Sequence, residues 1–232
     1  LSFEVAAGKP VYDIFEDAQI QPCYQQWDIN KPVLVGVDRG FHHPALVFEQ
    51  TNSFDQLMIM RLIQGQDIGL SKFLKEAKSQ MDTWFPGQSQ KGGYKVFIPP
   101  DAKEKEAEGE TWENRIKEFW GVTPQEPGND DVRRRVSAAY KQMGLRQDKR
   151  YGTIIDPVCE LLISAFKGGY AYPENINKAE DEKPHKDDIY DHTCNAHEAI
   201  CDQINKAVKK ISNKPLPKPR YDPITGRVIG YD

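Results

Sequence analysis

The sequence predicts an α/β protein in which a mixed sheet, three antiparallel strands and then parallel strands, is flanked by helices. Three observations favour this class. Three short apolar runs come first, separated only by turns, as in an antiparallel meander. Segments with apolar residues at helical spacing then alternate with further short apolar runs, an order typical of crossover connections between parallel strands. A long amphipathic segment follows them near the C-terminal end.

The first three strands are expected at residues 33–37, 45–48 and 56–64. The first run is rich in β-branched valine and lies between a proline and a glycine turn, which is typical of a buried strand. Asp38 ends this run, and a charge near the buried end of a hairpin is costly unless something compensates it. Two interpretations of Asp38 stay open, a cap of the turn and a ligand in a site.

A helix is expected from residue 69 to 84, because apolar residues recur there at helical spacing and a Pro-Gly pair follows. A fourth strand at 94–98 leads into Asp101, which places a second carboxylate at the end of a strand. The charged segment 102–110 has no apolar anchor and is expected to be a solvated loop or a short helix. The alternative for this segment is a mobile flap over a site.

The remaining elements are expected to be helices at 111–120, 128–144, 158–166 and 191–211 and a fifth strand at 151–155. Asp156 follows the fifth strand, and the proline after it makes helix capping its expected role. Residues 174–188 are polar and are expected to lack regular structure.

Three parts are expected along the chain: a lead-in segment at 1–30 packed on the domain, the domain itself at 31–212, and a linker with a short hairpin at 213–232. The last part is rich in proline and lysine up to Arg220, and a Thr-Gly turn follows. The chain begins without methionine, from which we expect an excised fragment of a longer protein.

Composition limits the classes of function. With 232 residues, 38% of them hydrophobic, the chain can bury one large core. No apolar run approaches the ~20 residues of a membrane span, and no P-loop motif is present. Four cysteines without CxxC spacing favour reduced thiols in a cytosolic compartment over a zinc site. The net charge of −4 means that binding of nucleic acid would need a local basic patch or a second module.

Acidic residues gather where the predicted sheet brings strand ends together. Asp38 on the central strand and Asp101 at the end of a neighbour can approach each other. The first turn of the last helix can close over both, and it carries Asp191, His192 and Asn195. Clustered carboxylates repel unless divalent cations neutralise them, and oxygen ligands suit Mg²⁺ or Mn²⁺. Two such ions, about 3.5 to 4 Å apart, can activate water and stabilise the leaving oxygen in phosphodiester cleavage, so the sequence predicts a two-metal nuclease.

Several segments of the sequence also carry a family resemblance. They are GKPVYDIF, VGVDRGFHHPALVFEQ, WFPG, PPDAKEK, VRRRVSAAY, IIDPVCELLISAFKGGYAYPE and PHKDDIYDHTCNAHEA. Together they resemble the nuclease domain of the tailed-bacteriophage large terminase subunit, a ribonuclease H-like nuclease that cuts concatemeric double-stranded DNA during genome packaging. The resemblance extends to about residue 205, and its most specific part is the Asp-Pro-x-Cys block followed by Gly-Gly-Tyr.

The resemblance implies that Asp38 is the first metal ligand and Asp101 the second, with two Mg²⁺ or Mn²⁺ ions as cofactors. Family members commonly have a third acid three residues after a histidine of the last helix. Here the histidine is His192 and the third position holds Asn195, which offers a carbonyl oxygen without a charge.

Three explanations of Asn195 stay open: another acid supplies the charge, the site is naturally weakened, or the chain is a variant that holds metal or DNA without cutting. Asp191, one helical turn earlier, could supply the charge instead, and Asp188 and Glu198 are weaker candidates. Asp191 or Asn195 is favoured as the third ligand, with His192 near the second metal. Asp191 also suits a helix cap, so both interpretations of Asp191 are kept.

Candidate DNA contacts are Arg39, Arg134 and Lys186. Arg39 stands where the family usually has an aromatic or apolar residue. Of the consecutive arginines 133–135, at most one or two can face a common ligand, because neighbouring helical residues point in different directions. Lys186, close to the last helix, is the better-placed phosphate contact. His42 and His43 follow Asp38 in a turn and are expected to be solvated, with a phosphate or metal contact as the alternative.

The resulting hypothesis is a metal-dependent endodeoxyribonuclease domain with little sequence specificity, acting in the host cell cytoplasm. The resemblance implies a terminase ATPase domain, a small terminase subunit and a portal protein as partners. One alternative is a catalytically weakened or inactive docking domain for DNA or portal, because Asn195 replaces the expected acid. Another is a resolvase or transposase of the same fold, which would need branched or end-specific DNA.

Overall fold

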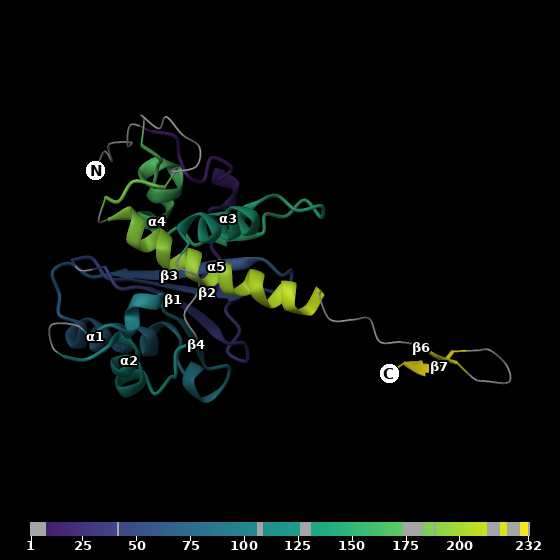
Figure 1. Ribbon diagram of the computed structural model, residues 1–232, viewed down its shortest axis with the longest axis horizontal. Coiled ribbons are helices and arrows are strands. Elements are labelled where there is room, and N and C mark those ends of the chain that lie inside the picture. The colour runs from purple at the N-terminus through teal and green to yellow at the C-terminus, as the bar shows by residue number, and fades with distance from the viewer. Residues whose placement is uncertain are drawn as a thin grey trace.

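A five-stranded mixed sheet forms the centre of the fold (Figure 1). Its strands are β1 (Val33–Asp38), β2 (Ala45–Thr51), β3 (Leu57–Gln64), β4 (Tyr94–Phe97) and β5 (Thr153–Ile155), in the spatial order β4-β1-β2-β3-β5. Strand β2 is antiparallel to β1 and β3, whereas β4 is parallel to β1 and β5 is parallel to β3. The predicted fold class, a mixed sheet with an antiparallel meander and parallel outer strands, is therefore confirmed.

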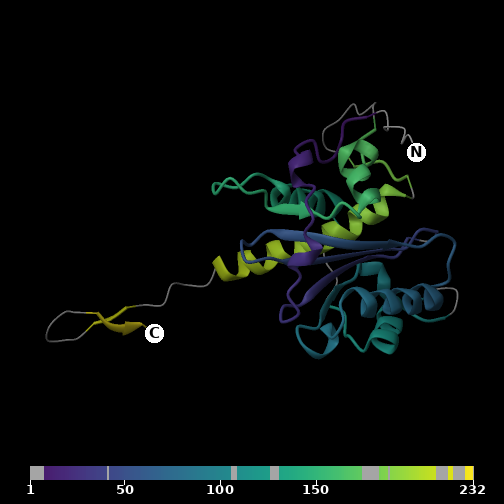
Figure 2. The same ribbon diagram turned by 180° about the vertical axis from the view of Figure 1, so that it is seen from behind.

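The computed structural model describes residues 8–40, 42–105, 109–125, 131–173, 183–187, 189–212, 219–221 and 228–231, and side chains as far as residue 206. Two layers of helices cover the sheet (Figures 1 and 2). Helices α1 (Leu70–Trp84) and α2 (Trp112–Trp120) lie on one face, and α3 (Val132–Met143), α4 (Glu160–Ser164) and α5 (Tyr190–Ser212) lie on the other. Within this described part, no helix is both long and apolar enough to cross a lipid bilayer.

Short turns of other helix types complete the fold. They are the 3₁₀ turns Asp17–Gln19, Tyr24–Gln26, Gln88–Gln90 and Pro100–Lys103 and the π-helical turn Ala165–Gly169, which continues α4. Strands β6 (Pro219–Tyr221) and β7 (Val228–Tyr231) pair antiparallel with each other near the C-terminus. They agree with the predicted C-terminal hairpin, whose Thr-Gly turn lies outside the described residues. The domain boundaries at residues 31 and 213 stay a prediction.

The sheet has a separate apolar core on each face because successive side chains of a strand point to opposite sides. In β1, Leu34 belongs to the core under α3, α4 and α5, whereas Val33, Val35 and Val37 belong to the core under α1 and α2. A strand buried on both faces shows a continuous apolar run, which is the pattern that predicted β1.

Helix α5 lies directly against the backbone of β1 at Gly36. A Cβ atom built on Gly36 would lie 1.9 Å from the carbonyl oxygen of Ala196, so no side chain fits between strand and helix. Since Asp38 is two residues further along β1, this contact fixes the end of the strand close to the first turns of α5.

Several elements differ from their predicted bounds. Strand β2 continues to Thr51, three residues beyond the apolar run, because Glu49 is buried and its carboxylate contacts His197 of α5 at 2.6 Å. Helix α3 begins at Val132, after Asp131 caps its first turn. The charged segment after β4 does have an apolar anchor, contrary to our prediction, since Ala102 is fully buried within the 3₁₀ turn. Residues 106–108 of that segment lie outside the described part.

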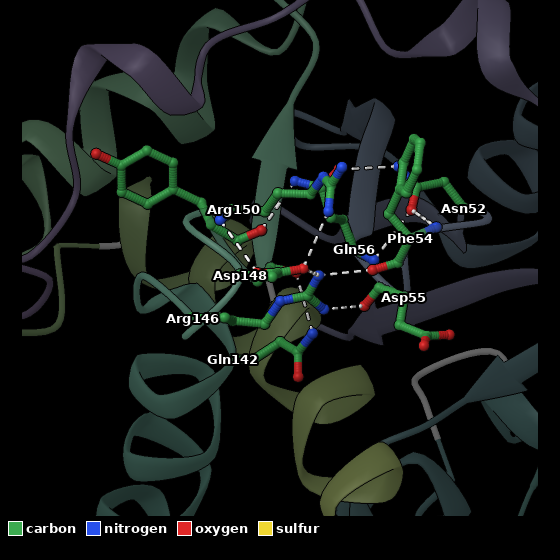
Figure 3. A network of polar contacts seen from close by, with 10 residues as sticks. Asn52, Phe54, Asp55, Gln56, Gln142, Arg146, Asp148 and Arg150 are labelled. Carbon is green, nitrogen blue, oxygen red and sulfur yellow. Dashed lines mark hydrogen bonds and ion pairs between the residues drawn. The ribbon is translucent and has the colours of Figure 1, made fainter.

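Polar contacts hold the β2–β3 turn against the segment between α3 and β5 (Figure 3). Arg146 donates hydrogen bonds to the carbonyl oxygens of Phe54, at 2.6 Å, and Asp55, at 3.1 Å. The Arg150 guanidinium lies 4.3 Å from the centre of the Phe54 ring, and Asp148 accepts hydrogen bonds from both arginines. These contacts lie at the surface and leave the predicted site residues untouched.

Asp156 fastens the lead-in segment to the sheet, which corrects its predicted role as a helix cap. Its Oδ2 accepts hydrogen bonds from the backbone amides of Cys23 and Tyr24, each at 3.0 Å, and its Oδ1 lies 3.6 Å from Arg61. The N-cap of α4 is Cys159 instead. The prediction failed because residues 8–30 are irregular. A sequence pattern does not show which of their backbone amides need a hydrogen-bond acceptor from elsewhere in the chain.

Replacing Asp156 by Ala is expected to lower the free energy of unfolding by about 3 kcal/mol, because the backbone amides of Cys23 and Tyr24 lose their acceptor and Arg61 loses its ion pair. Urea unfolding followed by tryptophan fluorescence measures this change. The control is Asp148→Ala in the exposed network of Figure 3, which should leave the unfolding midpoint unchanged. Equal effects of the two substitutions would contradict the anchoring role of Asp156.

Candidate active site

A cavity of about 360 Å³ lies where the ends of β1 and β4 meet the first turns of α3 and α5. All five residues predicted for catalysis or metal binding line it, namely Asp38, Asp101, Asp191, His192 and Asn195. The roles of these residues stay predictions, but the fold brings them into one place from three separate segments of the chain.

Asp38 and His192 form a close pair across the cavity. The Nδ1 atom of His192 lies 2.6 Å from Oδ2 of Asp38, and the backbone amide of Gly40 donates to the same oxygen at 3.4 Å. The side chains of Asp38 and His192 are 16% and 13% exposed, so both remain accessible from the cavity. These contacts at Oδ2 fix the orientation of the carboxylate.

Asp101 is held in place by Arg39, the residue that follows β1. The Nε atom of Arg39 lies 2.9 Å from Oδ2 of Asp101, and its Nη1 donates to the Asp101 carbonyl oxygen at 2.8 Å. Burial raises the pKa of Asp101, and the positive charge of Arg39 opposes this shift. Arg39 therefore positions a carboxylate, and its predicted contact with DNA is not tested by these distances.

Asp191 is 3% exposed and is not the cap of α5. Asp187 accepts hydrogen bonds from the backbone amides of Ile189, Tyr190 and Asp191, so it satisfies the first turn of the helix. The cap interpretation of Asp191 was therefore wrong. Burial raises the pKa of the Asp191 carboxyl group to about 6, His192 opposes the rise, and the negative charges of Asp187 and Asp38 add to it.

Asn195 faces an arginine that the sequence analysis did not select. Nη2 of Arg135 donates to Oδ1 of Asn195 at 3.4 Å, and Nε of Arg135 lies 3.9 Å from Oε2 of Glu198. Glu198 is fully buried, and its Oε1 accepts a hydrogen bond from the Tyr12 hydroxyl at 2.7 Å. Burial raises the pKa of Glu198 to about 7, while Tyr12 and Arg135 oppose that rise.

Helical phase was the signal that separates Arg135 from Arg134. The buried residues of α3 are Val136, Ala138, Ala139 and Met143. At about 100° per residue, Arg135 lies between Ala138 and Ala139 around the helix, whereas Arg134 lies outside the buried arc. In agreement, Arg135 lines the cavity, whereas Arg134 is a partly exposed partner of Asp202 at 3.0 Å and is not among the lining residues.

Lysines from the segment before α5 add positive charge to the cavity. Lys183 and Lys186 both line it, and the contact of Lys186 with a phosphate stays a prediction. His42 instead contacts Asp67 at 2.7 Å, and neither His42 nor His43 lines the cavity. Asp188, one of the two weaker candidates for the third acid, lies outside the described residues.

The oxygen atoms of the cavity suit a hard divalent cation. Oδ1 of Asp101 and Oδ1 of Asp191 are buried and have no hydrogen-bond partner among the described residues. Such unpaired oxygens are costly, and Mg²⁺ or Mn²⁺ would satisfy them. In the same described part, however, no three His, Cys, Asp or Glu side chains are spaced so that they could hold one ion. The oxygen atoms are thus of the type that these metals prefer, but the side chains are too far apart to bind one ion together.

Comparison with known proteins identifies the fold. No family model matches the sequence, and no curated protein sequence matches it either. The structure of the P22 large terminase nuclease domain matches with a TM-score of 0.57 at 13% identity, over 87% of this chain and 95% of that one. The chain has the fold of large terminase nuclease domains.

Two further structures extend the likeness to this terminase nuclease fold. The nuclease domain of the large terminase of bacteriophage SPP1, solved with bound Mn, matches at 13% identity with a TM-score of 0.51, over 83% of this chain and 93% of that one. A large terminase from a thermophilic bacteriophage matches at 12% identity with a TM-score of 0.66, over 86% of this chain. The match spans 46% of that terminase, so this chain corresponds to less than half of its length.

Proposed function

We propose that this chain is the metal-dependent DNA endonuclease domain of a phage DNA-packaging terminase, cleaving concatemeric double-stranded DNA with little sequence specificity. The observation that carries the proposal is the cavity in which Asp38, Asp101 and Asp191 meet from β1, the turn after β4 and α5. The terminase nuclease fold supports it, and so does the bound Mn of the SPP1 nuclease domain.

Asp38, Asp101 and Asp191 would hold Mg²⁺ or Mn²⁺, because their oxygens are the ligands that these ions prefer. When bound, such an ion lowers the pKa of a water molecule and stabilises negative charge on a phosphate. In the two-ion mechanism predicted from the sequence, Asp191 would supply the third anionic ligand in place of Asn195, which carries no charge.

The chain's own side chains prepare the cavity for a phosphodiester. His192 fixes the orientation of Asp38, and Arg39 fixes that of Asp101. Lys183 and Lys186 place positive charge at the rim, where it attracts the DNA backbone without reading its sequence. This local positive charge supports DNA binding by a chain whose net charge is −4.

A terminase ATPase domain, a small terminase subunit and a portal protein are proposed partners, and the host cell cytoplasm is the proposed location. A second candidate function is a docking domain for DNA or portal that has lost cleavage. The hydrogen bond from Arg135 to Asn195 favours it, because that oxygen is already engaged. The two functions differ in whether DNA is cut.

The test is a titration of Mn²⁺ and Mg²⁺ against supercoiled plasmid. We expect nicking and then linearisation that rise with metal concentration and stop when EDTA is added. Linear duplex and four-way-junction DNA should be cut at similar rates, because the proposed nuclease reads the backbone. If no plasmid is nicked at any metal concentration, the docking function replaces the enzyme. Preference for the junction would instead indicate a resolvase.

A further inference from the structure

A second cavity lies along α3, separate from the candidate active site. Its volume is about 410 Å³, and it is formed by one side of α3, by residues of the lead-in segment and by Tyr172. Arg135 lines the active-site cavity, whereas Arg133 lines the second one. Two residues apart in a helix, these arginines lie about 200° apart around its axis. Helix α3 therefore stands between the two cavities.

Positive charge predominates among the residues that line the second cavity. Its charged residues are three cations and one carboxylate, namely Lys9, Arg133, Lys141 and Asp13. The whole chain has a net charge of −4, so this is a local excess of positive charge. The adjoining cavity has the opposite balance, with the charged residues Asp13, Glu16, Asp17 and Lys167. An anion is thus attracted to the cavity along α3 and not to its neighbour.

The cations of α3 are spaced along one face of the helix. Arg133, Ser137 and Lys141 are four residues apart and share that face. All three are exposed, and the Arg133 side chain is 57% exposed. From Arg133 to Lys141 the helix rises about 12 Å, a length over which one strand of duplex DNA carries three to four phosphates. This spacing suits an extended polyanion rather than one small anion.

The carboxylates near these cations are exposed and hold them weakly. Lys9 lies 3.7 Å from Asp13, and Arg133 lies 3.9 Å from Asp131. Exposed ion pairs contribute little to stability, so a phosphate can replace either carboxylate at small cost. Among the described residues, the ammonium group of Lys141 has no ion-pair partner.

Backbone hydrogen bonds join the rim of this cavity to the rim of the candidate active site. The amide of Tyr172 donates to the carbonyl oxygen of Lys9 at 2.9 Å, and the amide of His185 donates to that of Ala171 at 2.8 Å. Tyr172 lines the second cavity, and His185 lines the active-site cavity. Neighbouring segments therefore connect the two rims, so one long ligand can reach both.

Duplex DNA is the polyanion that the proposed function supplies. Phosphate contacts made by lysine and arginine position a duplex without reading its sequence, and they gain strength from the release of counterions. Resting on the proposed nuclease function, we propose that the cavity along α3 binds the sugar-phosphate backbone of the duplex that the candidate active site cuts. Lys9, Arg133 and Lys141 hold phosphates beside the point of cleavage. This contact needs no metal ion, so it can be measured in EDTA.

The first experiment measures binding of a fluorescent duplex by anisotropy in EDTA, between about 50 and 200 mM salt. The slope of log Kd against log salt should be smaller by about two in the double variant Arg133→Gln, Lys141→Gln, because two phosphate contacts are lost. Its loss of affinity should therefore be about tenfold larger at the low salt concentration than at the high one. The charge-retaining variant Arg133→Lys, Lys141→Arg should keep the wild-type slope.

The control is the double variant Lys72→Gln, Lys75→Gln on α1, which lies on the opposite face of the sheet (Figure 1). It removes the same charge from exposed positions of a helix, so it corrects for the change in net charge. Its slope should equal that of the wild type, because salt screens distant charges. Circular dichroism shows whether each variant is folded. A folded cavity variant whose slope matches this control overturns the inference, and so does a wild type that binds no duplex.

The second experiment locates the DNA by photocrosslinking. All four cysteines of the chain are buried, so a thiol reagent labels a cysteine introduced at an exposed position selectively. Ser137→Cys places the reagent between the two cations of α3, and it should crosslink to the duplex in EDTA. Ser79→Cys is the matched control, because Ser79 is an exposed serine on α1. Equal crosslinking at the two positions, or none at position 137, overturns the inference.

The outcomes separate this inference from the function on which it rests. A wild type that nicks plasmid while the cavity variant keeps the wild-type slope overturns the inference and leaves the nuclease in place. A wild type that nicks no plasmid, but whose duplex binding depends on the cavity, removes the nuclease and leaves the DNA contact. A Glu-rich peptide is the probe for an acidic protein partner. If its binding depends on the cavity and duplex binding does not, the inference is overturned.

Discussion

Replacing Asp38 by Asn is expected to abolish DNA nicking, with a rate at least about 1,000-fold below the wild type. Asp38 stands at the end of β1, which is next to the edge strand β4 and not the central strand that the sequence predicted. It lines the cavity and contacts His192, so it is the carboxylate on which the metal site is proposed to depend. Asparagine has nearly the same shape, so the change removes the charge and leaves the fold intact. Gel assays of supercoiled plasmid over a range of Mn²⁺ concentrations measure the rate.

Asp67→Asn is the matched control for this experiment. Asp67 is exposed, contacts His42 and does not line the cavity. The same chemical change there should leave nicking unaffected. Mn²⁺ binding, followed by titration calorimetry, should weaken strongly in Asp38→Asn and stay unchanged in Asp67→Asn. Full nicking activity in folded Asp38→Asn would remove Asp38 from the proposed site.

Replacing Gly36 by Ala is expected to lower the free energy of unfolding by about 3 kcal/mol, the upper range for an overpacked core. The new methyl group would lie 1.9 Å from the Ala196 carbonyl oxygen, which is backbone and cannot turn aside. Strand β1 and helix α5 must therefore move apart. That movement separates Asp38 from His192, so nicking should fall even under conditions in which the variant remains folded.

Gly144→Ala provides the control for Gly36→Ala. A Cβ atom at Gly144 would meet its nearest neighbour, the carbonyl oxygen of Lys141, at an ordinary 3.6 Å. The backbone of Gly144 has φ −59° and ψ 156°, which alanine adopts without strain. Urea unfolding should show no loss of stability for Gly144→Ala. A Gly36→Ala variant as stable as this control would mean that β1 and α5 can adjust to a side chain between them.

The order and type of most elements followed from local patterns in the sequence. Continuous apolar runs predicted β1 and β3, because strands buried on both faces need apolar residues at successive positions. Helical spacing predicted α1 and α5, because a helix buried along one side needs apolar residues every three or four positions. The extension of β2 past Phe48 has no apolar pattern in the sequence. Its residue Glu49 is polar, and its burial depends on His197, a partner 148 positions away in the sequence.

The candidate site was predictable to the extent that strand ends define it. Asp38 and Asp101 follow neighbouring parallel strands, and parallel strands end at the same edge of a sheet, so the topology alone brought them together. Arg135 was missed because Arg134 was selected from the three consecutive arginines without use of the helical phase of α3. The role of Asp187 as the cap of α5 was missed as well, and recognising it would have removed one of the two interpretations of Asp191.

The hydrogen bond between Tyr12 and Glu198 means that a fragment must include residue 12 to keep this site intact. A fragment that starts at residue 31 would retain every proposed metal ligand, yet it would leave Glu198 buried without its hydroxyl donor. It would also lose the amides that Asp156 binds. The lead-in segment thus stabilises the residues around the cavity, and a functional fragment of this protein has to include it.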